Sequence, residues 1–296
     1  MYISYFTSKK INHIAFLLLI ISVSLSNNAV TQSTANNWVF GVGGGLAFDN
    51  MNTVNTPTTY ESLCNQNEGI ATMSDDNGNL LFYTDGAFIY DDQGAIIQDP
   101  SGVDYALLGH VSSTQSAIIV PDPADDEQYY IFTVGNVAND NGLQYLIYNA
   151  ISKSIVTFNF QLAANVTEKI TAVKKDDDSG YYIVSHDWGN DAFLVYMIDC
   201  NGLTTLATQN VGAVHSDQSI NSTLGYMKFN SDGTKLALAN SYGNNGAVGW
   251  GFVQVFDFDN LTGVISSNNI VSIGMNNALD ATDGSTLWTP YGLEFS

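Results

Sequence analysis

Histidine is the residue type in this chain most readily used for proton transfer, and the sequence contains four. His186 and Asp187 follow an apolar run, and an imidazole at a strand end can act as a general base or bind a metal ion. His110 and His215 belong to other segments between predicted strands. They can act with His186 only if the fold brings them to the same face. The alternative interpretation of each is a hydrogen-bonded structural histidine.

Two acidic turns concentrate the oxygen ligands that calcium prefers. Asp75 and Asn77 belong to the first turn, and Asp176 and Asp178 to the second. An EF-hand requires glutamate at position 12, and Gly86 occupies that position counted from Asp75. Calcium is therefore the one cofactor that the sequence suggests, and simple hairpin turns are the alternative.

Glu68 and Asp85 are candidates for a carboxylate pair of the kind that glycosidases use. Nothing in the sequence fixes their separation, and Asp85 with the following glycine is typical of a turn. The chain contains no Gly-x-Ser-x-Gly, His-Glu-x-x-His or Walker motif. No sequence motif therefore specifies a reaction.

Tryptophans near predicted loops are candidate binding residues. Trp188, Trp250 and Trp288 could stack on sugar rings or anchor a protein partner if they are exposed. Packing within or at the edge of the fold is the alternative for all three.

These residues are distributed over a repeated unit. An apolar strand, a turn rich in Asp and Gly, an aromatic or β-branched strand and a second hairpin recur near residues 67–100, 113–160, 168–210 and 223–268. Four-stranded repeats of about this length are typical of propeller blades, which bury both faces by stacking on their neighbours. The sequence therefore predicts an all-β fold, a β-propeller of four-stranded antiparallel blades.

Two further segments bear on how many blades the chain holds. Residues 37–40 are predicted to form an isolated strand that completes another blade and belongs to no following hairpin. Residues 290–296 resemble the start of the fourth repeat and predict the beginning of a next one. We expect about four blades, a truncated chain and an incomplete ring.

The charge balance narrows the choice of partners. The chain has 29 acidic and 8 basic residues and a net charge of −21, which disfavours nucleic acid and anionic membranes as partners. Two interpretations of the negative charge remain open: solubility in a salty exterior, and cation binding. Residues 1–31 have the basic and apolar regions of a signal peptide, which predicts export of residues 32–296 without a transmembrane anchor. Whether Cys64 and Cys200 pair is open.

Three strings carry a family resemblance: residues 67–86, 113–133 and 229–236. Together they resemble the N-terminal WD40-like or YVTN-type propeller regions of large secreted proteins of the Bacteroidetes. The resemblance implies type IX secretion and further C-terminal domains that end in a gliding-motility-associated sorting domain. It carries no catalytic motif that can be transferred to this chain.

The functional expectation is a non-catalytic binding or scaffold module, secreted or on the outer cell surface, with a protein or glycan partner. The alternatives are a purely structural domain of an adhesin and an extracellular enzyme, lactonase-like or glycan-active, that uses the central channel. An enzyme predicts histidines and carboxylates within hydrogen-bond reach at the channel mouth.

Overall fold

The computed structural model describes residues 33–48, 56–136, 141–215, 220–241, 251–274 and 290–296. The predicted signal peptide lies outside these ranges. Within them the chain is almost entirely β, with short 3-10 turns at η1 (Ser33–Ala35) and η3 (Ile220–Thr223). A search of these ranges finds no helix with the length and apolar character that crossing a membrane requires.

The first sheet consists of β1 (Asn37–Phe40), β2 (Val42–Ala47) and β3 (Thr58–Asn65) in that order. The prediction that residues 37–40 belong to no following hairpin is therefore wrong. Gly41 has φ +60, and this left-handed conformation lets the chain turn between β1 and β2. In β2, Gly45 has no side chain on the side where the Tyr60 ring lies.

The second sheet is shorter than its repeat suggests. It contains β4 (Ala71–Ser74), β5 (Leu80–Thr84) and β6 (Ile89–Asp91). In place of a fourth strand there are two isolated bridges, Tyr90 with Ile96 and Gln98 with Asp104.

The next three sheets are antiparallel meanders in chain order. The third contains β7 (Ala117–Asp122), β8 (Asp125–Val134), β9 (Leu143–Asn149) and β10 (Ser154–Ala163). The fourth contains β11 (Val166–Lys174), β12 (Gly180–Asp187), β13 (Ala192–Asp199) and β14 (Gly202–Thr205), and β15 (Gln209–Asn210) also pairs with β13. The fifth contains β16 (Met227–Phe229), β17 (Lys235–Asn240), β18 (Phe252–Asp259) and β19 (Val264–Ile265), and β20 (Val271–Gly274) also pairs with β18.

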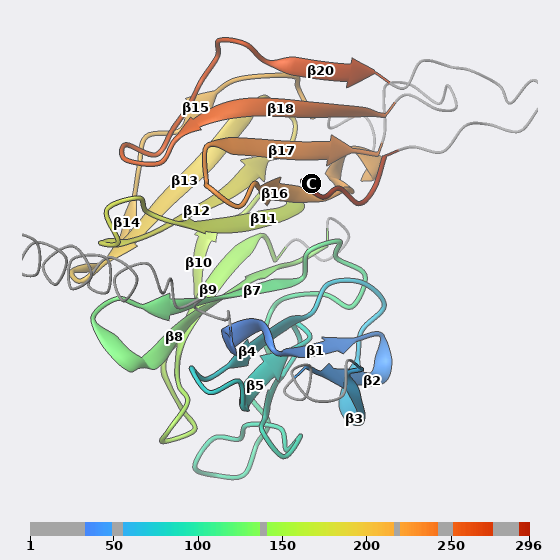
Figure 1. Ribbon diagram of the computed structural model, residues 1–296, viewed down its shortest axis with the longest axis vertical. Helices are drawn as coiled ribbons and strands as arrows, with labels where there is room; N and C mark the ends of the chain where they lie inside the picture. Colours follow the sequence, from blue (N-terminus) through green and yellow to red (C-terminus); the bar gives the residue numbers. More distant parts are fainter. Residues whose placement is uncertain (1–32, 49–55, 137–140, 216–219, 242–250, 275–289) are drawn as a thin grey trace, which may run out of the picture.

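Figure 1 shows the five sheets following one another around an arc, from β1 in blue to β20 in red. The first strands of successive sheets, β1, β4, β7, β11 and β16, contact one another and form the inner wall. Each sheet extends outward from its inner strand, which is the arrangement of propeller blades. The predicted β-propeller fold is confirmed.

A separate apolar core lies between each pair of neighbouring sheets. Representative buried side chains are Val39 and Tyr83 between the first two, Phe82 and Ile131 between the second and third, Phe132 and Ile183 between the third and fourth, and Val184 and Phe256 between the fourth and fifth. Sheets from the second to the fourth therefore bury both faces, which explains why their central strands are apolar on both sides.

Three peripheral features complete the description. The outer strand β10 exposes Val156, Phe158 and Phe160 at alternate positions. Cys64 is buried, Cys200 is exposed and both are free, so they do not pair. Residues 290–296 form no strand, but the Tyr226 amide donates to the Tyr291 carbonyl at 2.7 Å.

Candidate functional site

Polar side chains gather where the chain enters the inner strands. In the second to fifth sheets, residues just before or at the start of the inner strand lie at one end of the propeller, where the last residues of β1 meet them. We call this group the channel mouth and define it by Glu68, Thr114, Gln115, Glu168, Tyr226 and Tyr291. Glu68, Thr114, Gln115 and Tyr226 precede β4, β7 and β16, and Glu168 is the third residue of β11.

A cavity of about 330 Å³ opens at the channel mouth. It is lined by Val39, Phe40, Glu68, Gly69, Ile70, Thr114, Gln115, Ala117, Ile118 and Tyr226. Apolar and aromatic walls with a few polar groups are typical of small-molecule sites, and the volume lies at the lower end of their range.

Each of the two carboxylates of the channel mouth accepts hydrogen bonds from its neighbours. The Tyr291 hydroxyl donates to Glu68. The Thr114 amide and hydroxyl donate to Glu168 Oε2 at 2.9 and 3.1 Å.

The charge of Glu68 affects the pKa values of three other residues of the channel mouth. Burial raises the pKa of Glu168, the Thr114 hydrogen bonds oppose this rise, and the Glu68 carboxylate adds to it. Burial and then Glu68 likewise raise the pKa values of Tyr226 and Tyr291. The Glu68 carboxylate therefore acts on the other ionisable groups of the channel mouth, and the charge of Lys169 opposes it at Glu168.

Gln115 has a structural role in the same place. Its Oε1 accepts from the amides of Met227 at 2.8 Å and Ile170 at 3.3 Å, and its Nε2 donates to the Met227 carbonyl at 3.1 Å. One amide side chain thereby connects the third, fourth and fifth sheets at their inner strands.

Lys169 follows Glu168 on β11 and points to the other side of the strand. Its Nζ donates to the carbonyls of Ser222, Thr223 and Leu224, at 3.4, 2.7 and 2.8 Å, at the end of η3. The side chain is fully buried, and this burial lowers its pKa to about 7. Sequence reasoning missed both Glu168 and Lys169.

Of the predicted histidines, the structure brings two together. The rings of His186 and His215 stack with centroids 3.8 Å apart and an interplanar angle of 19°, and both residues are fully buried. Burial lowers the pKa of His186 to about 3 and that of His215 well below its usual value, and the charge of Lys169 contributes to both. We call Lys169, His186 and His215 the basic cluster.

The basic cluster does not have the geometry of an acid–base or metal site. His186 Nδ1 lies 2.6 Å from the Asp187 carbonyl, whereas His186 Nε2 and both His215 ring nitrogens have no hydrogen-bond partner among the described residues. The Asp187 carboxylate accepts from the side-chain amide of Asn190 at 2.6 Å. Nearly parallel stacked rings cannot direct in-plane lone pairs at one ion. A search of the described ranges finds no group of three metal-ligating side chains.

His110 has partners of its own. Its Nδ1 accepts from the Ser112 amide at 3.1 Å, and its carbonyl accepts from the Ser113 amide at 2.9 Å. Among the described residues, none of these contacts links His110 to the stacked pair of His186 and His215.

In the acidic turns proposed for calcium, carboxylates cap backbone amides. The Asn79 side-chain amide donates to Asp75 Oδ2 at 2.9 Å, and the backbone amides of Asn77 and Asn79 donate to Oδ1 at 2.9 and 2.8 Å; these bonds lower the pKa of Asp75. In the second turn Asp178 pairs with Lys174 at 2.6 Å, while Asp176 is exposed.

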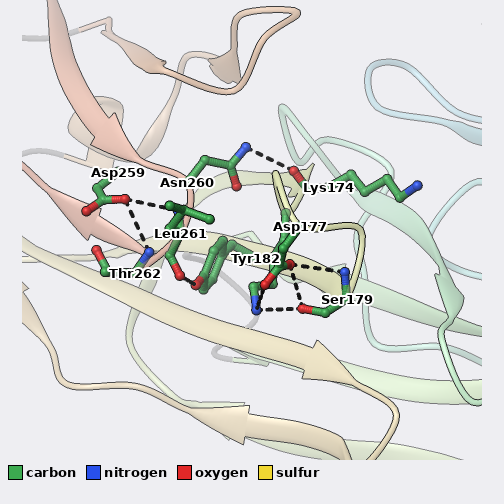
Figure 2. Close-up of polar contacts among 9 residues, drawn as sticks. Lys174, Asp177, Ser179, Tyr182, Asp259, Asn260, Leu261 and Thr262 are labelled. Atoms are coloured by element: carbon green, nitrogen blue, oxygen red, sulfur yellow. Dashed lines mark hydrogen bonds and ion pairs between the residues drawn. The ribbon is translucent and has the colours of Figure 1, made fainter.

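Figure 2 shows the second turn beside the turn that follows β18. Asp177 accepts from the amide and hydroxyl of Ser179, and Asp259 from the amide of Leu261. Between the two turns, Tyr182 donates through its hydroxyl to the Leu261 carbonyl at 2.8 Å. These turns thus contribute to the packing of the fourth sheet on the fifth.

The remaining candidates have structural partners or lie outside the described residues. Trp188 is half-buried, and its Nε1 donates to Ser222 Oγ at 2.9 Å. Trp250 and Trp288 lie outside the described ranges. Asp85 accepts from the amides of Ala87 and Phe88 and from the Tyr90 hydroxyl, so its carboxylate supports a turn.

Comparison with known proteins gives weak likenesses only. No family model and no curated protein matches the chain. It is similar to a functionally unknown protein from Desulfotomaculum acetoxidans, with a TM-score of 0.45 and 11% identity over 85% of this chain and 70% of that one. It is also similar to a candidate 6-phosphogluconolactonase from Bacteroides fragilis, with a TM-score of 0.44 and 14% identity over 79% and 67% of the two chains. Likenesses this low support no statement about function.

Proposed function

We propose that this chain is an exported propeller module that binds a glycan at its channel mouth and leaves it chemically unchanged. The composition of the mouth cavity carries the proposal. It combines the aromatic side chains of Phe40 and Tyr226 with the carboxylate of Glu68 and the hydroxyl of Thr114. Aromatic rings stack on sugar rings, and such polar groups bond sugar hydroxyls.

Export and a place on the outer cell surface are part of the proposal. They are supported by the apolar leader in residues 1–31, by the high acidic surplus and by the resemblance of residues 67–86 and 113–133 to secreted Bacteroidetes propellers. The same resemblance supports further domains in the complete protein and type IX secretion.

The positions of the histidines favour binding over catalysis. The stacked pair is buried against Phe193 and Phe252, and no carboxylate oxygen is within hydrogen-bond reach of its rings among the described residues. A lactonase-like mechanism that uses this stacked pair as its base therefore has no support.

A glycan-active hydrolase is the second candidate function. A protonated carboxylic acid beside a charged carboxylate is the pair that glycosidases use, and the raised pKa of Glu168 beside Glu68 fits that pattern. However, Glu168 is only 3% exposed and lies behind Thr114, outside the cavity lining. This position gives the acid no direct path to a substrate oxygen.

A glycan array with the full exported protein, followed by chromatography of the bound glycans, tests both candidates. We expect binding to a limited set of glycans, which are recovered intact. Tyr226→Ala should weaken this binding, and Phe158→Ala, an exposed aromatic residue on β10, should leave it unchanged. Absence of binding to every glycan would overturn the proposal, and release of shortened glycans would favour the hydrolase.

A further inference from the structure

The cavity at the channel mouth contains a charged side chain, which a neutral sugar does not require. Among the described residues that line the cavity, Glu68 is the only charged one. It is half-buried, and its carboxylate accepts from the neutral Tyr291 hydroxyl. A carboxylate held by one hydroxyl retains acceptor positions for a ligand cation.

No lysine of the described chain neutralises this carboxylate. Lys169 points away and is held by three carbonyls at η3. Lys228, close in sequence to Tyr226, forms its ion pair with Glu294. Among the described residues, the Glu68 carboxylate is therefore left without an ion pair, which a ligand cation can supply.

The walls of the cavity suit an organic cation better than a bare metal ion. Phe40 and Tyr226 contribute aromatic side chains, and Val39, Ile70 and Ile118 contribute aliphatic surface. Ammonium groups are attracted to aromatic faces, whereas hard metal ions need several oxygen ligands. The chain's net charge of −21 also attracts cations toward the protein.

We propose that the channel mouth selects glycan units that carry a free, protonated amine, and that Glu68 binds this ammonium group. This inference rests on the proposed glycan-binding function and adds the ligand's charge to it. In the bound state the ammonium donates to Glu68, while the sugar ring lies against the aromatic walls. An N-acetylated unit offers no charge to Glu68 and requires room for its acetyl group.

The test is calorimetric titration of the full protein at pH 6 with three tetrasaccharides, built from glucosamine, N-acetylglucosamine and glucose. We expect the glucosamine tetramer to bind about tenfold more tightly than the other two at low salt, the factor that corresponds to one modest ionic contact. Glu68→Gln should abolish this preference and retain the binding of neutral sugar. Glu61→Gln removes an exposed charge outside the cavity and should retain the preference.

Each outcome supports or overturns a defined claim. Equal affinity for the three tetramers would overturn the amine selection and leave the glycan-binding function intact, whereas absence of binding would overturn both. If Glu61→Gln and Glu68→Gln lost the preference for the glucosamine tetramer equally, the amine selection would also be overturned, because the general negative charge of the protein would then explain the preference. If Glu68→Gln does not fold, the wild-type protein decides: the preference must shrink severalfold between 20 mM and 500 mM salt.

Discussion

Glu168 and Lys169 are neighbours on β11, yet their side chains belong to two different regions of the propeller. Successive side chains of a strand point to opposite faces, so Glu168 meets Thr114 of the preceding blade and Lys169 meets η3 before the following one. The channel mouth holds Glu68 beside a cavity, whereas the basic cluster is sealed and burial lowers the pKa values of its groups. The difference indicates that access to the cavity, more than residue type, distinguishes the proposed ligand-binding group from the structural ones.

The largest expected effect is a loss of stability when Lys169 of the basic cluster is replaced. Lys169→Met leaves three carbonyls at η3 without their donor, which should lower the free energy of unfolding by about 2 to 4 kcal/mol. Urea denaturation at pH 7 measures it. Lys174→Met, an exposed position on the same strand, is the matched control and should change stability by less than about 1 kcal/mol. Equal stability of both variants would mean that Lys169 is not a structural anchor.

The second prediction concerns pH. The pKa of His186 is near 3 in the folded chain and near 6.5 in the unfolded chain, so the unfolded state binds more protons between these values. The contribution of each buried histidine to the free energy of unfolding is therefore complete above pH 6.5. It is lost as the pH falls toward 3, by about 1.4 kcal/mol per pH unit for each histidine.

Urea midpoints at pH 5, 6 and 7 test this dependence. His186→Leu/His215→Leu should show a flatter profile than the wild-type protein, because the proton uptake on unfolding is removed. His110→Leu is the control for a histidine outside the basic cluster. A double variant with the wild-type slope would contradict the assignment of this pH dependence to the stacked pair.

The third prediction compares two residues of the channel mouth by their effect on stability. Gln115→Ala removes the side chain that connects three inner strands and leaves the Met227 amide and carbonyl without these bonds, so unfolding should become easier by about 1 to 3 kcal/mol. Glu68→Gln should have almost no effect on stability, because among the described residues its carboxylate accepts from the Tyr291 hydroxyl alone. Thermal unfolding of the two variants compares them directly. Similar losses in both would contradict the distinction between structural and ligand-binding residues at the channel mouth.

The smallest effect is expected at Glu168. Its pKa is raised by burial, so its contribution to stability is present below its unfolded value and is lost as the pH rises through the folded value. At pH 8, Glu168→Gln should therefore be as stable as the wild-type protein or slightly more so, because the amide removes a buried charge and still accepts from Thr114. A clear loss of stability by urea denaturation would show that the charge itself holds the blades together.

Local patterns were sufficient to predict the propeller but insufficient to find its site. Asp–Gly turns between apolar runs identified the repeats because they are short-range signals. The first sheet was missed because β2 contains Gly43, Gly44 and Gly45, which lack the side chains that indicate a strand. The stacking of His186 on His215 joins segments 29 residues apart, and no periodicity reports such a contact. Glu168 and Lys169 gave one overlooked signal, which was adjacent charges at the start of an apolar strand.

The outer strand β10 bears on how molecules of this protein meet one another in solution. It lies at the edge of its sheet and presents Val156, Phe158 and Phe160, a surface on which another strand can pair. A net charge of −21 keeps such edges apart through long-range repulsion. Because the screening length shrinks from about 30 Å at 0.01 M salt to about 8 Å at 0.15 M, colloidal stability should fall as salt is added. Dilute buffer, rather than saline, is then the medium in which the purified protein stays dispersed.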